Sequence, residues 1–412
     1  MSVIESVNNH EQWLDFLLYK QNNGALSKKE EKELEEFIDN KRYKYYYDLI
    51  KKSSFPSDYP TKITVNKEGT EKKRIVYSFN GEENIVLKFI AFNLYRFDDI
   101  FSKNCYSFRR GYGVKDAINT FRGNTKFASK YCFKADISNY FNSIDEDILL
   151  RKMTFIKERD CEMYNLFERI LKEDRVYDNK EIKCEKHGAM AGMPCSPFFA
   201  NVYLADVDKY FEDRKVPYYR YSDDVLIFAD TEAELNELIE RFYEKIRENR
   251  LNINTSKVTV TKPFEPFEFL GFSYNNGIID LSANTMRKLK AKIKRKSDAL
   301  RRWQRSKGLT SDKAAIGFIN TMNRKFFGGG SIEWNEDDFT WCRWFFPNIT
   351  TDKSLKEIDE YMQEYIRYIV TGRHYKGNYR ITYEQLKSWG YKSLVHEYYR
   401  WKKKIKAYNE QR

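Results

Sequence analysis

The sequence has no long uninterrupted run of apolar residues. None of its apolar stretches approaches the roughly 20 residues that a helix needs to cross a bilayer, which argues against a membrane-spanning protein. The first 20 residues become polar within a few positions and lack the basic-then-apolar layout of a signal peptide. We therefore expect a cytoplasmic protein that has no membrane partner.

Cysteine and histidine are scarce, and their spacing does not suit a metal site. The six cysteines form no C-x-x-C pair, and the four histidines are scattered along the chain. Structural zinc sites need such ligands at short, regular spacings. We expect no structural zinc, and cysteines that are mostly packed thiols in a reducing compartment.

Positive charge and aromatic rings are abundant. The chain has 73 Lys+Arg against 61 Asp+Glu, a net charge of +12, and 17% aromatic residues. A basic surface favours polyanions such as nucleic acid. Rings and cations are interleaved at Lys41–Lys52 and Glu397–Lys406. Each stretch either stacks on the bases of a single strand or forms an amphipathic helix with half-buried tyrosines.

The order of the patterns predicts an α+β fold. Length suggests two or three structural units. Periodicity predicts helices up to about residue 55, a break at Ser53–Pro60, and two strands around a turn at Lys67–Thr70. Strands and helices then mix until about residue 281. Helices follow from Asn284 onward, with a flexible break at Gly328–Gly330.

Two neighbouring carboxylates stand between apolar strands in YYRYSDDVLIFAD, residues 218–230. The segment VLIF shows no polar alternation, so we expect a buried hairpin with Asp223 and Asp224 at its turn. Buried like charges are costly without a compensating cation, although a solvated Asp-rich turn is also common. Asp136 ends another apolar strand. Asp136 and Asp223 on adjacent strands could hold two Mg²⁺ ions about 3.5–4 Å apart, with Asp224 assisting.

Five motifs in order resemble a reverse transcriptase, of the bacterial group that includes group II intron, retron and defence-associated enzymes. They are ADISNYF, GMPCSPFFANVYLADVD, YSDDVLIF, LNINTSK and FEFLGF. The resemblance starts at KKRIVYSF, includes YSFRRGYGVKDAI, and covers about half of the chain. It implies an RNA-directed DNA polymerase that uses Mg²⁺, dNTPs, an RNA template and a DNA product.

The resemblance also implies a right-hand architecture. The regions are an N-terminal helical region at 1–55, fingers at 56–130, a palm with an antiparallel sheet at 131–280, a basic helical thumb at 281–345 and a helical extension at 346–412. A structured non-coding RNA is the expected template, gripped in part by the N-terminal helix and the C-terminal tail.

Individual residues take roles from the same resemblance. Asp136, Asp223 and Asp224 match the metal-binding aspartates, and Lys257 matches a lysine that can donate a proton to pyrophosphate. The remaining matches are nucleotide-binding residues, primer-grip residues and candidate nucleic-acid contacts. The nucleotide-binding matches are Lys73, Arg74, Ile137, Phe141 and Gly192. The primer-grip matches are Leu270 and Gly271. The candidate nucleic-acid contacts are Arg109, Arg110, Lys288, Lys292 and Arg295. Phe141 matches the ring that excludes a 2′-hydroxyl, although Tyr140 or Phe141 is expected to be a core aromatic.

Departures from the family pattern refine the group. Ala191 stands where many relatives have a glutamine that frames the nucleotide. The only V-T-G lies at Val370–Gly372, far from the retron position, and no H-N-H-type nuclease segment follows. The chain is therefore most similar to defence-associated enzymes, with a C-terminal stretch similar to class 2. Two alternatives stay open: template-independent or protein-primed DNA synthesis, and a non-catalytic RNA-binding scaffold.

Overall fold

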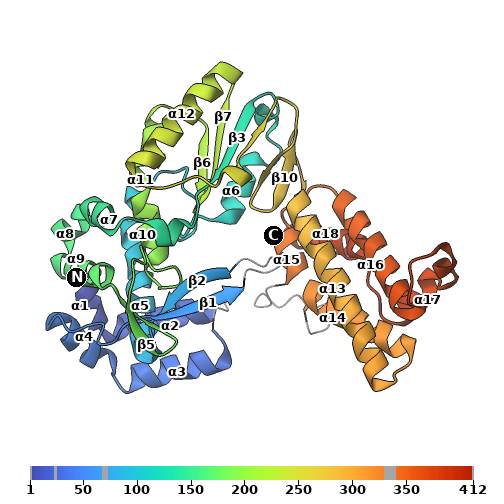
Figure 1. Cartoon of the computed structure of the whole chain (residues 1–412), viewed down its shortest axis with the longest axis horizontal. Helices are drawn as coiled ribbons and strands as arrows, with labels where there is room; N and C mark the ends of the chain where they lie inside the picture. The colour runs from blue at the N-terminus through green and yellow to red at the C-terminus, as the bar shows by residue number, and fades with distance from the viewer. Residues whose placement is uncertain (1, 23–25, 67–72, 329–339, 411–412) are drawn as a thin grey trace. The chain divides into compact units, whose positions relative to one another are not determined.

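The computed structural model describes residues 2–22, 26–66, 73–328 and 340–410 (Figure 1). Backbone contacts divide the chain into two compact units. The first comprises residues 1–120 and 129–265, and the second comprises residues 121–128 and 266–412. In the described ranges, each helix is either too short or too polar to span a bilayer.

The first unit begins with the predicted helices. They are α1 (Val3–Val7), α2 (His10–Asn22), α3 (Lys28–Asp39) and α4 (Tyr43–Lys51). Trp13 of α2 is fully buried, and its ring stacks on Phe89 with centroids 3.9 Å apart. In α4, Tyr43 and Tyr46 are buried whereas Tyr45 is 52% exposed. The basic-aromatic stretch at Lys41–Lys52 is therefore an amphipathic helix.

A four-stranded sheet follows in the order β2-β1-β4-β5. Its strands are β1 (Thr61–Asn66), β2 (Lys73–Ser78), β4 (Arg175–Asp178) and β5 (Glu181–Cys184). The first two strands were predicted, and the turn expected at Lys67–Thr70 lies outside the described residues. The second pair was not predicted, because EIKC is exposed and carries no strong apolar pattern.

The second sheet of this unit carries the acidic motif, in the order β6-β7-β3-β8. It consists of β3 (Tyr131–Asp136), β6 (Tyr218–Tyr221), β7 (Asp224–Ala229) and β8 (Thr259–Thr261). Residues 225–228 of β7 are all fully buried, which confirms the prediction from VLIF. Helices α11 (Ala205–Asp213) and α12 (Glu232–Glu248) pack against this sheet (Figure 1).

Helices and 3-10 turns complete the first unit. Four side chains that recur at four-residue spacing are fully buried: Phe199, Tyr203, Val207 and Phe211. Two short helices carry them, because the helix is interrupted at Leu204. The elements not yet given are α5 (Gly81–Asn93), η1 (Leu94–Ile100), α6 (Val114–Phe121), η3 (Tyr140–Ser143), α7 (Glu146–Lys152), α8 (Thr154–Arg159), α9 (Cys161–Lys172), α10 (Ser196–Tyr203) and η4 (Thr255–Lys257).

The second unit joins a small antiparallel sheet to helices. Its elements are η2 (Thr125–Phe127), β9 (Phe267–Phe269), β10 (Phe272–Asn275), β11 (Ile278–Leu281), α13 (Ala283–Lys307), α14 (Ser311–Phe327), α15 (Trp341–Phe345), α16 (Lys353–Thr371), η5 (Lys376–Arg380), α17 (Tyr383–Ser388) and α18 (Leu394–Glu410). The structure groups residues 266–280, predicted as palm, with the helices that follow them. Of the predicted break at Gly328–Gly330, only Gly328 lies within the described residues.

Mixed sheets and helices confirm the predicted α+β class. The second aromatic-basic stretch, Glu397–Lys406, lies in α18, where Tyr398 is fully buried and Tyr399 is 49% exposed. This stretch is again an amphipathic helix that uses tyrosine for packing. In both stretches, the packing explanation accounts for the buried rings.

Candidate active site

Strand pairing brings the three predicted aspartates to one end of the β6-β7-β3-β8 sheet. β3 and β7 are antiparallel, and Asp136 lies directly opposite Asp224. The N–H of Ile137 donates to the carbonyl of Asp223 at 3.0 Å. Asp223 lies in the two-residue turn between β6 and β7, whereas Asp224 is the first residue of β7 rather than a turn residue as predicted.

Burial and mutual charge disfavour ionisation of the pair. Burial and, second, the charge of Asp136 raise the pKa of Asp223, which Lys257 and Arg74 partly offset. Burial raises the pKa of Asp224 to about 6, although the neighbouring Lys134 opposes this rise. Such a concentration of negative charge at a partly buried position favours binding of a cation.

Two lysines contact the outer carboxylates. The Lys257 ammonium donates to Asp136 at 2.5 Å, and the Lys134 ammonium lies 3.5 Å from Asp224. Among the described residues, no three His, Cys, Asp or Glu side chains are gathered closely enough to form a metal site. Asp136, Asp223 and Asp224 nevertheless offer hard carboxylate oxygens at one end of the sheet, and this is the type of ligand that Mg²⁺ prefers.

Lys257 is not part of a strand. It lies in the 3-10 turn η4, and only Thr259–Thr261 pair as a strand. The cause is local: the N–H of Asn254 donates to the carbonyl of Asp136, and the N–H of Lys257 donates to the carbonyl of Asn254. This turn brings the Lys257 ammonium to the Asp136 carboxylate.

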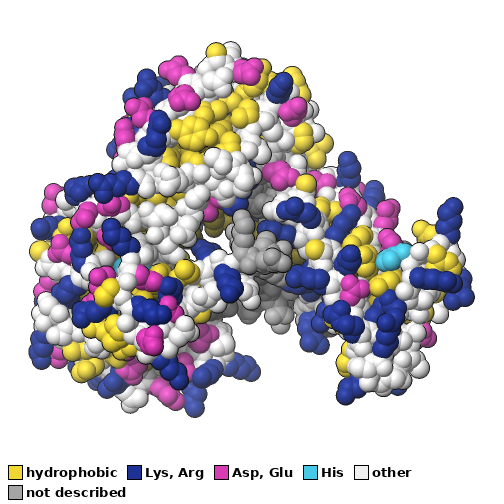
Figure 2. Space-filling view, viewed as in Figure 1, with side chains coloured by type: hydrophobic (Ala, Val, Ile, Leu, Met, Phe, Trp, Pro, Cys, Tyr) yellow, Lys and Arg dark blue, Asp and Glu magenta, His cyan; other side chains and the backbone are white. Residues whose placement is uncertain are grey.

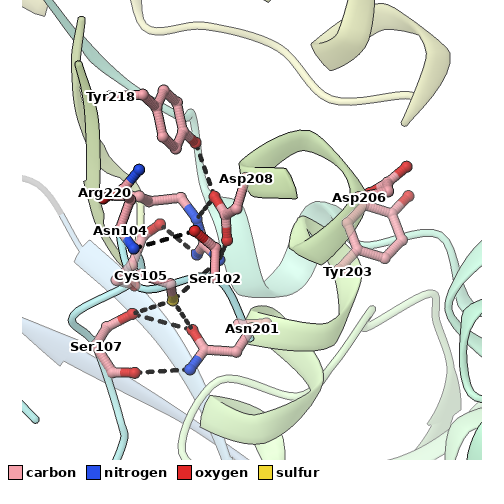
Figure 3. Close-up of polar contacts among 12 residues, drawn as sticks. Ser102, Asn104, Cys105, Ser107, Asn201, Tyr203, Asp206, Asp208, Tyr218 and Arg220 are labelled. Carbon is pink, nitrogen blue, oxygen red and sulfur yellow. Dashed lines mark hydrogen bonds and ion pairs between the residues drawn. The ribbon is translucent and has the colours of Figure 1, made fainter. Parts of the chain in front are cut away.

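A buried ion pair supports the turn that carries Asp223 (Figure 3). Arg220 and Asp208 are both fully buried, and the guanidinium donates twice to the carboxylate, at 2.5 and 2.6 Å. Arg220 also donates to the carbonyl of Ser222 at 3.2 Å, and Ser222 has a positive φ of 59°. Arg220 therefore helps to hold the strained residue just before Asp223.

The same network joins the segment Ser102–Ser107 to the sheet. Arg220 contacts the Cys105 sulfur at 3.2 Å, and the Tyr218 hydroxyl donates to Asp208 at 2.9 Å. Asn201 of α10 donates to the carbonyl of Ser107 at 2.6 Å (Figure 3). This network was not predicted from the sequence. The available signal was a charged residue, Arg220, within the tyrosine-rich strand β6.

The pKa of Asp224 gives a testable pH dependence. Asp224→Asn is expected to raise the free energy of unfolding by about 1–3 kcal/mol at pH 8, because it removes a charge that folding disfavours. The folded wild type binds this proton below about pH 6 and the unfolded chain only near pH 3.8, so the gain should fall to about half at pH 5 and disappear at lower pH. Urea denaturation of the wild type and the variant in EDTA, at both pH values, measures the difference in the free energy of unfolding.

A matched control uses an exposed aspartate that directly follows β7. Asp230 is 73% exposed and pairs with Lys130, so Asp230→Asn is expected to change stability by less than about 1 kcal/mol at either pH. An Asp224→Asn gain that is equal at pH 5 and pH 8 would contradict the assignment of the charge as its cause.

Several predicted nucleotide-binding residues lie on segments that contact one another. Asn142 donates to the carbonyl of Ile75 in β2 and accepts from the N–H of Ala191. Gly192 has a φ of 106°, and a Cβ there would lie 2.9 Å from the carbonyl of Tyr77. This close approach requires glycine. Ala191 is buried, and its carbonyl accepts from the N–H of Tyr77.

The aromatic pair after Asp136 divides as expected. Tyr140 is buried and its hydroxyl donates to the carbonyl of Ala200, whereas Phe141 is only partly buried. In β2, Lys73 and Arg74 are exposed, and the charge of Arg74 influences Asp223. Of these two cations, Arg74 therefore has the more direct connection to the acidic site.

Two predicted contacts have structural roles instead. The Ile137 side chain is buried, which leaves it inaccessible to a nucleotide. The backbone N–H of Ile137 donates to the carbonyl of Asp223. The side chain of Arg109 is only 11% exposed, pairs with Asp98 at 3.0 Å and donates to the carbonyls of Ser102 and Cys105. The Arg109 guanidinium thus stabilises the loop that carries it, and its contacts within the protein conflict with the predicted nucleic-acid contact.

Arg110 is exposed, and its guanidinium lies over three rings. The distances to the ring centroids are 5.0 Å for Tyr19, 4.5 Å for Phe92 and 4.7 Å for Tyr95. This packing leaves the residue at the surface of the first unit. Its contact with nucleic acid stays a prediction.

The predicted primer-grip residues form the tight turn of the β9–β10 hairpin. Leu270 and Gly271 have positive φ values of 52° and 85°. The Gly271 carbonyl accepts from the N–H of Ser282 and from the Thr285 hydroxyl at the start of α13. The backbone at Gly271 therefore lies close to the start of α13. Contact of this turn with a primer stays a prediction.

Basic side chains are numerous on the visible face of the second unit (Figure 2). In α13, Lys288 and Arg295 are exposed and Lys292 is partly exposed. The helix buries Met286, Leu289, Ile293 and Ser297 on its opposite side. Lys290 instead pairs with Glu357 of α16 at 2.5 Å. The exposed cations are suitable for phosphate contacts.

Curated proteins and solved structures give little information about the family of this chain. No curated protein matches the sequence. Solved telomerase structures show low similarity. Apo telomerase from Candida tropicalis has a TM-score of 0.45 and 11% identity, over 86% of this chain and 65% of that one. Its form truncated from the C-terminal domain has a TM-score of 0.42 and 12% identity, over 57% of this chain and 59% of that one. Telomerase from Candida albicans with a telomeric RNA fragment has a TM-score of 0.43 and 11% identity, over 86% of this chain and 69% of that one. The chain thus spans 59–69% of the length of these proteins.

The family model for reverse transcriptase (RNA-dependent DNA polymerase) matches residues 65–274, just over half of the chain. This range includes Asp136, the Asp223–Asp224 pair and Lys257, whose arrangement is described above. The chain belongs to the reverse transcriptase family.

Proposed function

We propose that the chain is an RNA-directed DNA polymerase that copies a partner non-coding RNA into cDNA. The observation that carries the proposal is the placement of Asp136 opposite Asp224, with Asp223 in the adjacent turn and Lys257 on Asp136. Carboxylates on the adjacent ends of β3 and of the β6–β7 hairpin are suited to two-metal nucleotidyl transfer, and burial raises the pKa values of Asp223 and Asp224.

Asp136 and Asp223 would hold two Mg²⁺ ions, with Asp224 assisting. Mg²⁺ bound there supplies Lewis-acid stabilisation of the charge that develops on the phosphate oxygens. The primer 3′-hydroxyl attacks the α-phosphate of a dNTP, and pyrophosphate leaves. Lys257 is a hydrogen-bonded cation at the acidic cluster, so we assign to it proton donation to the leaving group.

Arg74, Gly192 and Phe141 are the proposed nucleotide contacts. Arg74 is exposed on β2 and its charge lowers the pKa of Asp223, which supports a role for this cation in contacting the triphosphate. The backbone conformation of Gly192 leaves no side chain between its loop and β2. Lys288, Lys292 and Arg295 of α13, together with Arg110, are the proposed contacts to nucleic acid backbone.

Phe141→Ala is expected to admit ribonucleotides. A flat ring against the sugar would exclude a 2′-hydroxyl, so its removal should lower the ratio of kcat/KM for dNTP over rNTP by about tenfold or more. Single-nucleotide incorporation on an RNA template measures the ratio. Phe155→Ala on α8, another partly buried phenylalanine, is the control. An unchanged ratio for Phe141→Ala would assign the discrimination to another residue.

We further propose a role in bacterial antiphage defence, which rests on the motif resemblance and on the alanine at position 191. Sequencing of RNA and DNA that co-purify with the protein from its host tests the template. The expected result is cDNA complementary to one abundant structured RNA. DNA without complementarity to the bound RNA, or DNA covalently attached to protein, would favour template-independent or protein-primed synthesis.

A further inference from the structure

Phe108 combines two unfavourable features. Its φ is +56°, a left-handed conformation that bulky side chains rarely adopt, and its ring is 36% exposed. Strained backbone at such a residue persists only when the surrounding structure imposes it. Strained residues of this kind gather at functional sites, so the cause and the consequence of this conformation are informative.

Hydrogen bonds and an ion pair hold both chain neighbours of Phe108, Ser107 and Arg109, in place. Ser107 is fully buried, donates to Asn201 at 3.0 Å and accepts from the same side chain (Figure 3). Arg109 pairs with Asp98 and donates to two carbonyl groups of its own loop. These flanking contacts fix the backbone at Phe108 and direct where its ring lies.

The ring of Phe108 lies between the proposed sugar-recognition residue and the catalytic hairpin. Its centroid is 6.0 Å from that of Phe141, in an edge-on arrangement of 69°. It is 6.2 Å from that of Tyr221, two residues before Asp223. Phe108 and Gly192 also line one cavity of about 390 Å³ in the first unit. The ring is thus in contact with an open space that adjoins the nucleotide-binding loop.

We propose that Phe108 is a positioning residue that sets the selectivity for deoxyribonucleotides by holding the ring of Phe141 in place. The inference rests on the proposed function, since it assumes polymerisation with discrimination at Phe141. Because Phe141 is only partly buried, its ring needs a neighbour to limit its rotation. Edge-on packing by Phe108 supplies this restraint.

Phe108→Ala is expected to lower the dNTP-over-rNTP ratio of kcat/KM by about tenfold, while dNTP incorporation is largely retained. Phe108→Gly should act alike and relieves the backbone strain, so it separates loss of the ring from poor folding. Phe108→Tyr keeps the ring and should keep the ratio. In the Phe141→Ala background, Phe108→Ala should change the ratio no further, because Phe108 acts through Phe141.

Phe264→Ala is the matched control, because Phe264 is also exposed and has a positive φ of 67°, but lies between β8 and β9. It should leave the ratio unchanged. Wild-type protein that polymerises dNTPs, combined with an unchanged ratio in Phe108→Ala and Phe108→Gly, overturns this inference alone. An additive effect of Phe108→Ala and Phe141→Ala also overturns it. Wild-type protein without polymerisation contradicts the proposed function itself.

Discussion

Replacing Asp223 and Asp224 together by alanine is expected to reduce dNTP incorporation at least about a thousandfold. The expectation follows from the loss of the proposed metal-holding groups, which together would supply several kcal/mol of transition-state stabilisation. Primer extension on an RNA template with purified protein measures the loss. The double variant should still fold, because both pKa values are raised and removal of the charges relieves a strain on the folded state.

Two further measurements separate catalysis from folding. Mg²⁺ is expected to raise the Tm of the wild type and to have a smaller effect on the double variant, since a ligand that binds the folded state stabilises it. Glu35→Ala with Glu36→Ala removes two adjacent exposed acids of α3 and should leave incorporation unchanged. Synthesis near the wild-type level in the Asp223 and Asp224 variant would refute the assigned site.

The second large effect is expected at the buried ion pair. Arg220→Met should lower the free energy of unfolding by about 3–5 kcal/mol, because it leaves the Asp208 carboxylate buried, with the Tyr218 hydroxyl as its one remaining side-chain donor among the described residues. Chemical denaturation measures the change. The variant should also lose dNTP incorporation, because the carbonyl of Ser222 loses the donor that supports the turn.

A double substitution tests the origin of this effect. Asp208→Leu with Arg220→Met replaces both charges by apolar groups and should recover most of the lost stability. Arg241→Ala breaks an exposed ion pair with Glu244 and is expected to cost less than about 1 kcal/mol. An Arg220→Met variant as stable as the wild type would show that the pair does not hold the hairpin together.

The hairpin could be predicted because its signal is local. The apolar run at Val225–Phe228 requires burial on both faces, and the structure confirms this. Pairing of β3 with β7 was inferred from two apolar strands that each carry an aspartate at one end, and it is also observed. The α+β class follows from the same alternation of patterns.

The missed features depend on contacts between distant segments. Asp208 and Arg220 look like surface charges when each is considered alone, and only their pairing explains their burial. The role of Arg109 depends on Asp98 and on its own loop, which local sequence does not reveal. Lys257 reaches Asp136 through a 3-10 turn that the alternating pattern of INTSKVTV conceals.

Primer extension on a defined RNA template tests the central claim most directly. Purified protein is supplied with a primer annealed to RNA, Mg²⁺ and one dNTP at a time. We predict addition only of the dNTP complementary to the next template base, with none in EDTA. Addition irrespective of the template base, or no addition under any condition, would contradict RNA-directed DNA synthesis by Asp136, Asp223 and Asp224.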